Sequence, residues 1–175
     1  EELLKAGKIH AVEVLNYMEY YPVAFDWCNQ YGIAPMANTD IHDLISGDYG
    51  WGGGKFRPLT LVFATERSEK GIKEALFARR TAALFDNKLV GKSEYLMKLI
   101  QSSLKIRRIN AGTIEVTNIS DIPYEMTNGG NLYLFPCRKT VRIGIPKEGA
   151  LVFENCFVGM NQKLSIPFEW WSSIF

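Results

Sequence analysis

Residues 9–42 have the sequence IHAVEVLNYMEYYPVAFDWCNQYGIAPMANTDIH, which predicts a strand, a helix and a second strand in succession. Ile9–Leu15 is rich in Val and Ile and predicts a buried strand. Pro22 suits the first turn of the helix and Gly32 its end. The expected apolar face of this helix consists of Ala24, Trp27, Cys28 and Tyr31. Ile33–Thr39 is the second strand, so this stretch indicates a right-handed βαβ unit with parallel strands.

The same alternation continues to about residue 101. The further elements expected there are a helix end at Glu1–Gly7, strands at Pro58–Thr65 and Thr81–Phe85, a helix capped by Ser68, and a last helix at Lys92–Ser102. Parallel strands are buried on both faces, and three or four of them cannot close a barrel. Residues 1–101 are therefore expected to be the last part of a distorted β/α barrel. We expect the chain, which begins at Glu1, to be cut from a longer one.

The helical period ends near residue 102, and short strand candidates follow. They are Leu104–Ile109, Thr113–Asn118, Leu132–Phe135, Thr140–Ile145, Leu151–Val158 and Leu164–Trp170. Turn residues separate them, and Thr140–Ile145 alternates clearly between polar and apolar side chains. Six or seven short strands in such a span predict an all-β immunoglobulin-like sandwich over residues 102–175. The predicted fold class is thus α/β followed by all-β.

The overall composition argues against two kinds of partner. The chain has 20 Lys and Arg residues against 19 Asp and Glu residues, so no electrostatic signature of nucleic-acid binding stands out. No apolar run approaches the roughly 20 residues that a membrane span requires.

The cysteines Cys28, Cys137 and Cys156 form no CxxC pair. Cys137 and Cys156 could form a disulfide, although strand cysteines are more often buried thiols.

The strongest candidate for a functional site is the segment Asn38–His42, with the sequence NTDIH. It lies where a predicted strand ends and a glycine-rich loop begins. On an extended backbone, Asp40 and His42 project to the same face. A carboxylate and an imidazole in that arrangement can share a metal ion or bridge two. The C-terminal ends of strands are also where barrel enzymes assemble their sites. Taken alone, an Asp-x-His triplet is more often a pair of solvated loop residues, or a capping Asp beside a surface His.

The triplet and its flanks resemble one known family. In phosphoesterases of the PHP (polymerase and histidinol phosphatase) type, the last metal-binding motif is an Asp-x-His after a short strand. Residues 7–16, GKIHAVEVLN, are similar to the preceding strand of that family, with its Val-Glu-Val-x-Asn pattern. Residues 57–64, RPLTLVFA, and residues 71–81 resemble the strand and helix that follow the motif in a two-domain branch. A β-rich C-terminal domain follows in that branch.

The resemblance implies hydrolysis of a phosphate ester at a multinuclear site of divalent metal ions (Zn, Mn or Fe). Asp40 and His42 would be metal ligands, and the substrate would be a phosphorylated small molecule. The family's His-x-His motif, middle Glu and further His ligands have no counterpart here, and His10 does not match a family ligand. The chain is therefore expected to be inactive without the missing N-terminal part of the same protein. The sequence does not determine the cellular compartment, and the resemblance to the two-domain branch favours the periplasm or cell envelope.

Asn16 and Arg57 are weaker candidates for substrate binding. Asn16 ends its strand at the same rim, and Arg57 follows the glycine-rich loop and could grip a phosphate. Alternatively, Asn16 is only a turn residue at the end of its strand, and Arg57 only forms a surface ion pair. Tyr49, Trp51 and Phe56 in or beside the loop are further candidate contacts, and Trp170-Trp171 is interpreted as a packing anchor.

Two other functions remain open. The chain could be a non-catalytic binding or structural module, in which the β-sandwich docks on the barrel remnant or on a partner. The incomplete metal site and the aromatic-rich C-terminus favour that alternative. A third reading is carbohydrate binding through exposed Trp and Tyr side chains, for which the sequence shows no platform pattern.

Overall fold

The computed structural model describes residues 2–49, 56–146 and 149–169. The chain divides into two compact units, described separately below. The N-terminal unit is Glu1–Tyr95 with Phe157–Gln162, and the C-terminal unit is Leu96–Cys156 with Lys163–Phe175. The expected domain limits, residues 1–101 and 102–175, stay a prediction. Within the described segments, no helix is both long enough and apolar enough to span a membrane.

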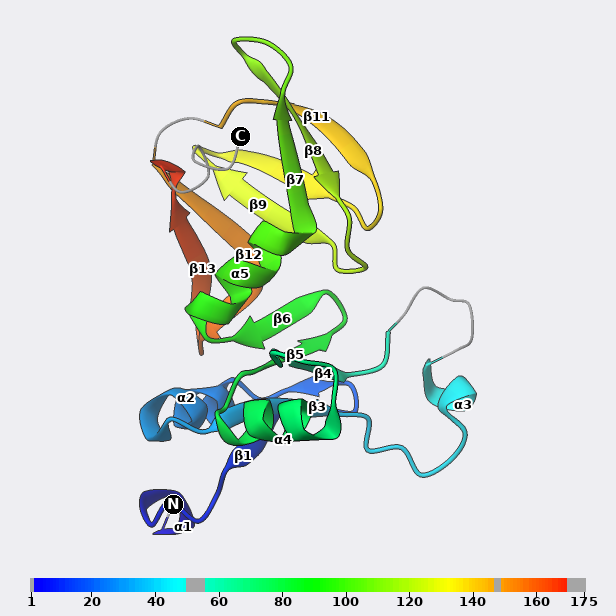
Figure 1. Cartoon of the computed structure of the whole chain (residues 1–175), viewed down its shortest axis with the longest axis vertical. Coiled ribbons are helices and arrows are strands. Elements are labelled where there is room, and N and C mark those ends of the chain that lie inside the picture. Colours follow the sequence, from blue (N-terminus) through cyan, green and yellow to red (C-terminus); the bar gives the residue numbers. More distant parts are fainter. Residues whose placement is uncertain (1, 50–55, 147–148, 170–175) are drawn as a thin grey trace. The chain divides into compact units, whose positions relative to one another are not determined.

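The N-terminal unit contains the predicted strand-helix-strand succession. Strand β1 (Ala11–Asn16) pairs in parallel with β3 (Ala34–Asn38), and α2 (Pro22–Tyr31) connects them (Figure 1). A short strand, β2 (Glu19–Tyr20), adds to the other edge of β1 in antiparallel orientation. Gly32 ends α2 in the left-handed conformation, with φ 61°. The parallel βαβ unit is therefore confirmed, whereas β2 was not predicted.

The remaining strands of this unit run differently from the prediction. Strands β4 (Leu59–Val62), β5 (Thr81–Phe85) and β6 (Lys88–Gly91) form consecutive antiparallel pairs. Helix α4 (Glu69–Phe77) lies in the connection between β4 and β5, and the Ser68 side chain caps it by accepting from the Gly71 N–H. The expectation of parallel strands is wrong here, and the barrel remnant stays a prediction.

Two local features explain the antiparallel order. Asp86 and Asn87 have φ values of 44° and 69°, and this left-handed pair turns the chain directly from β5 into β6. The Phe63 N–H donates to the Arg80 carbonyl at 2.9 Å, so the connection through α4 returns to the end of the sheet that it left. The helix is therefore an insertion in a long hairpin and does not act as a crossover.

The core of the N-terminal unit lies between α2 and the strands. Its buried members are Leu4, Val14, Leu15, Phe25, Cys28, Ile33, Ala37, Ala83 and Val90. Phe25 and Cys28 form the buried face of α2. Trp27, expected on that face, is 37% exposed. The helix is thus rotated relative to the predicted face, because Phe25 supplies the large buried ring.

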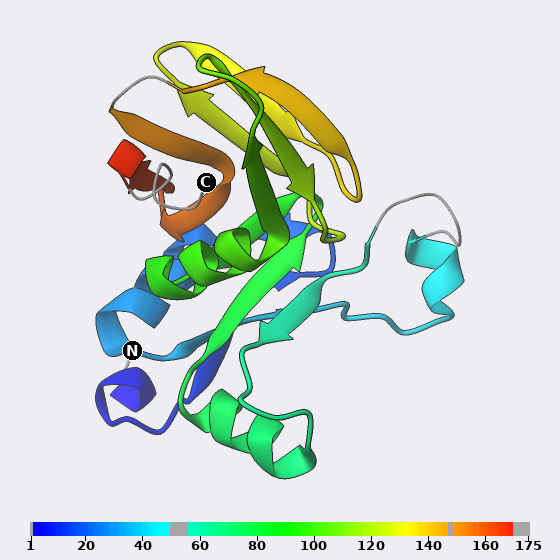
Figure 2. The same cartoon turned by 45° about the horizontal axis from the view of Figure 1, so that its top comes forward.

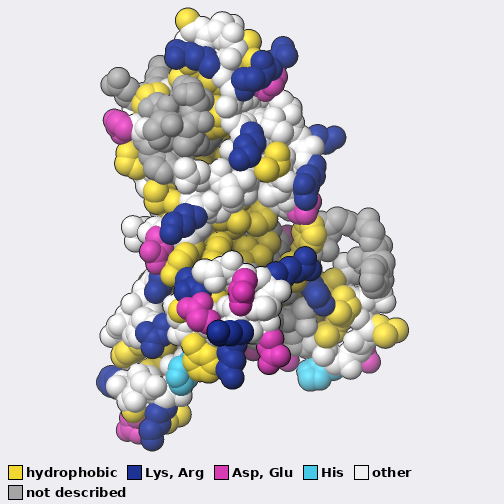
Figure 3. Space-filling model, viewed as in Figure 1, with side chains coloured by type: hydrophobic (Ala, Val, Ile, Leu, Met, Phe, Trp, Pro, Cys, Tyr) yellow, Lys and Arg dark blue, Asp and Glu magenta, His cyan; other side chains and the backbone are white. Residues whose placement is uncertain are grey.

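Two short helices also lie in the described part of this unit. Helix α1 (Glu2–Lys5) precedes β1, and α3 (Ile45–Tyr49) lies within the segment predicted as a loop. Figures 1 and 2 both show α3 after the loop that leaves β3, away from the strands of this unit. Figure 3 shows Lys and Arg side chains scattered over both units on the face drawn, with acidic side chains between them.

The C-terminal unit is predominantly β-structure, and the part of α5 (Ser93–Ser103) from Leu96 onward contributes Leu96 and Ile100 to its core. Its strands, visible in Figure 2, are β7 (Leu104–Arg108), β8 (Thr113–Asn118), β9 (Tyr124–Asn128), β10 (Asn131–Phe135), β11 (Thr140–Gly144), β12 (Ala150–Gly159) and β13 (Gln162–Pro167). One sheet has the order β11-β8-β7, and the other strands follow the order β10-β9-β12-β13.

Residues in β8 and β9 alternate between buried and half-buried, as expected for strands that cover a core on one face. The β-rich second half is therefore confirmed, with β9 as an additional strand. An immunoglobulin-like strand order stays a prediction.

Candidate functional site

Asp40 and His42 lie in the loop that follows β3. The strand ends at Asn38, and Asp40 has a left-handed backbone with φ 48°. The predicted extended geometry is therefore wrong, since neither residue belongs to the strand. The two side chains nevertheless approach each other, with His42 Nε2 3.6 Å from Asp40 Oδ1. Asp is one of the residues that tolerate this backbone conformation best, so the turn is locally permitted.

This pair lies in an open depression of about 490 Å³, which we call the acidic depression. Its lining residues are Asn16, Tyr17, Glu19, Tyr21, Asp40, His42, Asp43 and Asp48. They come from the end of β1, from β2 and its flanks, from the loop that follows β3, and from α3. Asn16 is thus brought together with Asp40 and His42, as predicted. Arg57 is described and exposed, and it does not line the depression.

Glu13 organises the ends of β1 and β3. Its carboxylate accepts from Asn16 Nδ2 at 2.7 Å and from Asn38 Nδ2 at 2.5 Å, which links the ends of β1 and β3. The Tyr17 N–H donates to the Asn38 carbonyl at 3.1 Å and adds a further link between these ends. Glu13 belongs to the Val-Glu-Val-x-Asn stretch, but nothing in that pattern identified its two partners.

The contact with Glu13 determines how the Asn16 amide is oriented. A carboxylate can only accept hydrogen bonds, so Asn16 must turn its nitrogen toward Glu13 and its oxygen away. Asn16 Oδ1 is buried and has no hydrogen-bond partner among the described residues. A buried acceptor in that state is costly unless a water molecule or an ion satisfies it. Asn16 Oδ1 is therefore a buried acceptor that a bound water molecule would satisfy.

The acidic depression has a negative electrostatic character. Four carboxylates line it, and no Lys or Arg does so within the part of the chain that the structure describes. The Tyr21 hydroxyl donates to Glu19 Oε2 at 2.5 Å, and this bond, with burial and nearby carboxylates, raises the pKa of Tyr21. Burial, followed by the charges of Asp48 and Asp40 among others, raises the pKa of Tyr49. Such a field attracts cations and opposes an unneutralised phosphate.

The spacing of the Asp-His pair is suited to one cation. Two ligands at about 2.1 Å from a tetrahedral metal ion lie about 3.4 Å apart, close to the 3.6 Å measured here. Among the described residues, no group of three or more His, Cys, Asp and Glu side chains could hold a metal ion. His10 is exposed and packs edge-on against Phe77, with ring centroids 5.8 Å apart. The described residues therefore bring together two side chains of a kind that binds metal ions, Asp40 and His42.

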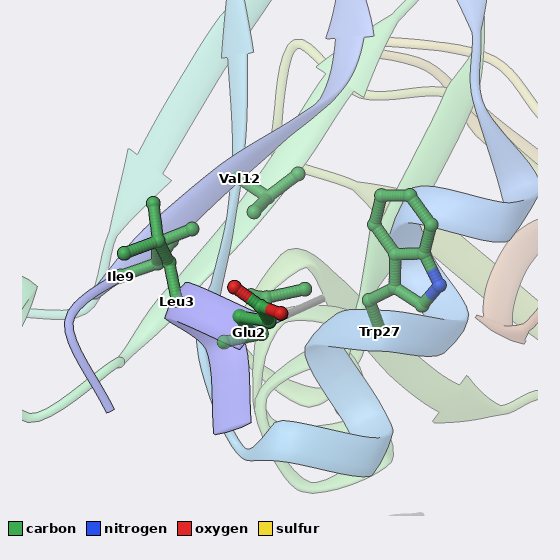
Figure 4. Close-up of a pocket in the computed structure, with 6 residues that line it drawn as sticks. Glu2, Leu3, Ile9, Val12 and Trp27 are labelled. Atoms are coloured by element: carbon green, nitrogen blue, oxygen red, sulfur yellow. The ribbon is translucent and has the colours of Figure 1, made fainter. Parts of the chain in front are cut away.

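A second depression, of about 440 Å³, lies between α1, β1 and α2. Figure 4 shows Trp27 on one side of it, with Leu3 and Ile9 on the other. Glu2 is its one charged lining residue among those described, and the rest are apolar. Without convergent polar groups it offers no chemistry, so the acidic depression is the candidate site.

The aromatic residues expected to contact a substrate near the loop differ in burial and position. Tyr49 is buried, and its hydroxyl donates to the Thr39 carbonyl at 3.1 Å. Phe56 is 49% exposed. Trp51 and Trp170-Trp171 lie outside the described residues. Tyr17 and Tyr21 line the depression although they were not predicted, because the sequence does not show which faces of the β1–β2 turn meet the loop.

No protein-family model matches the chain, and no curated protein matches it either. A solved structure from Bacteroides vulgatus ATCC 8482 is similar, with a TM-score of 0.85 and 30% sequence identity over 95% of this chain. It is a two-domain protein containing a predicted PHP-like metal-dependent phosphoesterase. This chain covers 54% of that one, so it spans about half of its length. The chain is thus similar, in fold and in sequence, to about half of a two-domain PHP-like protein.

Proposed function

We propose that this chain is the C-terminal portion of a metal-dependent phosphoesterase and that Asp40 and His42 are two of its metal ligands. The observation that carries the proposal is the 3.6 Å approach of an exposed Asp-x-His pair that lines an acidic depression. The likeness to a protein containing a predicted PHP-like phosphoesterase supports it. The proposed substrate is a phosphorylated small molecule, and the remaining ligands would come from the N-terminal part of the same protein.

The donor atoms agree with a divalent metal ion. A carboxylate and an imidazole suit Zn, Mn or Fe, and they do not select among these metals. Divalent ions held there would act as Lewis acids that activate water and neutralise the phosphate. With no Lys or Arg among the described lining residues, the phosphate charge needs such a counterion.

The residues of this chain have three separate tasks in the proposed reaction. Asp40 and His42 would hold the metal, and Glu13 would keep the Asn16 amide oriented. Asn16 Oδ1 would accept a hydrogen bond from a water molecule in the depression. In hydrolysis, water oxygen bonds to phosphorus, the ester P–O bond breaks, and the alcohol leaves with a proton from that water.

The test compares Asp40→Asn and His42→Ala in the full-length protein. Asn tolerates the left-handed backbone at residue 40, so the variant removes charge with little strain. We expect each variant to lower turnover of a simple phosphate ester about 100-fold or more, and to lower bound metal measured by elemental analysis. The expectation rests on the 10–100-fold loss typical of weaker, outer-shell changes.

Matched controls are available in the same unit. Asp86→Asn changes another left-handed Asp, with φ 44°, that does not line the depression. His10→Ala removes the other histidine of the chain. Both controls should retain turnover and metal content. Near-normal activity in Asp40→Asn and His42→Ala would refute the assignment, and a full-length protein that binds no metal and hydrolyses no ester would favour the non-catalytic module.

A further inference from the structure

Tyr17 has a backbone conformation that is unfavourable for its side chain. It is the first residue of the two-residue turn between β1 and β2, and its φ is 52°. Left-handed backbone costs a bulky residue about 1–2 kcal/mol, and such turns favour Gly or Asn. Core burial does not offset this strain, because the side chain is 41% exposed and lines the acidic depression. Strain of this kind is typical of positions where a side chain has a function.

Other rings hold Tyr17 in place. Its ring meets that of Tyr49 at 68°, with centroids 6.3 Å apart. Tyr49 is in turn edge-on to Phe85, with centroids 6.3 Å apart, and its hydroxyl is bonded to the Thr39 carbonyl. The Tyr17 ring is therefore supported from the protein side and open on the side of the depression.

Tyr21 presents a second ring to the same depression. It is 43% exposed, and its hydroxyl donates to Glu19 Oε2 at 2.5 Å. The hydroxyl is thus engaged, and the ring is the part left available for contact. Two restrained aromatic rings near Asp40 and His42 provide a surface for a flat apolar group, since aromatic rings gain from stacked or edge-on contact.

We infer that Tyr17 and Tyr21 bind an aromatic ring carried by the phosphate ester, and that the substrate class of this site is therefore an aromatic phosphate ester. The inference rests on the proposed function, because it assumes that the ester lies beside Asp40 and His42. Both side chains are specificity-determining residues that touch the substrate away from phosphorus. Restrained tyrosines suit this task because little conformational entropy is lost when a ligand binds them.

The experiment uses the metal-loaded full-length protein with phenyl phosphate and methyl phosphate as probes. Tyr17→Gly removes the ring and relieves the backbone, and Tyr17→Asn does the same with a side chain present. Both variants should lower kcat/KM for phenyl phosphate about 10-fold or more, mainly through KM, as expected for a lost stacking contact. Their kcat/KM for methyl phosphate should fall clearly less, because that ester carries no ring for Tyr17 to contact. Tyr17→Gly should also unfold at the same temperature as the parent or at a higher one.

Met18→Gly is the matched control. Met18 is the other residue of the same turn, is 49% exposed and does not line the depression. The variant adds flexibility without removing an aromatic ring, so it should treat both esters as the parent does. An equal loss on both esters in Tyr17→Gly, or no loss on either, would overturn the inference while leaving the phosphoesterase assignment intact.

A binding measurement separates the inference from the proposed function. Saturation-transfer NMR of phenyl phosphate should show transfer to its ring protons in the parent and much less in Tyr17→Gly. Absence of transfer in the parent overturns the inference. Hydrolysis of neither ester with Zn, Mn or Fe, together with ring transfer that depends on Tyr17, would overturn the proposed reaction and retain the aromatic site.

Discussion

Thr60 in β4 satisfies both backbone groups of Ala37 in β3 with one hydroxyl. Thr60 Oγ1 accepts from the Ala37 N–H and donates to the Ala37 carbonyl, each at 2.9 Å. Ala37 is 3% exposed and directly precedes Asn38, where β3 ends. The contact therefore anchors the strand that leads to Asp40 and His42.

Thr60→Val replaces the hydroxyl by a methyl group of similar size, so the cost comes from polar groups and not from a cavity. Each buried backbone group left without a partner costs about 1–3 kcal/mol. With two such groups at Ala37, we expect the free energy of unfolding of the N-terminal unit to fall by about 2–6 kcal/mol. Thr60→Ser keeps the hydroxyl, so its free energy of unfolding should fall clearly less than that of Thr60→Val.

The assay is urea unfolding combined with amide hydrogen exchange at Ala37. Thr60→Val should lower the urea midpoint and speed exchange of the Ala37 amide, which loses its acceptor. The control is Thr140→Val, which breaks an exposed hydroxyl pair with Thr117 and should change stability by about 0.5 kcal/mol or less. If Thr60→Val costs no more than Thr140→Val, the Thr60 bridge does not stabilise β3 and the reasoning is refuted.

Two further predictions concern buried ionisable groups. Burial raises the pKa of Cys28 and of Cys156 to about 12, and all three cysteines are free thiols. A thiol reagent at neutral pH should therefore label half-buried Cys137 first and the other two at the rate of unfolding, whereas rapid labelling of all three would contradict this. Burial also raises the pKa of Tyr124 to about 12, above the ordinary value near 10. The folded state thus favours the protonated phenol, so this stabilisation is complete below about pH 10 and is lost between about pH 10 and 12. Urea midpoints across that range should fall less in Tyr124→Phe than in the parent, and identical pH dependence would disprove the assignment.

The sequence determined those features that depend on near neighbours in the chain. Pro22 and Gly32 mark the ends of α2, and apolar runs on either side of it predicted β1 and β3 in parallel. The spacing of Asp40 and His42 predicted that their side chains meet, although the left-handed turn at Asp40 was not foreseen. Alternation and turn residues predicted a β-rich second half because both signals act over a few residues.

Only the tertiary structure decided which distant groups meet. Glu13 bonds to the side chain of Asn38 across two strands, and Tyr17 packs against Tyr49 of α3. The antiparallel order of β4, β5 and β6 likewise departs from the local strand-helix pattern. Local periodicity reports which face of an element is buried, whereas pairing depends on free energy shared between segments far apart in sequence. The acidic depression is a product of such pairing, and so its carboxylates and tyrosines could be placed together only in the folded chain.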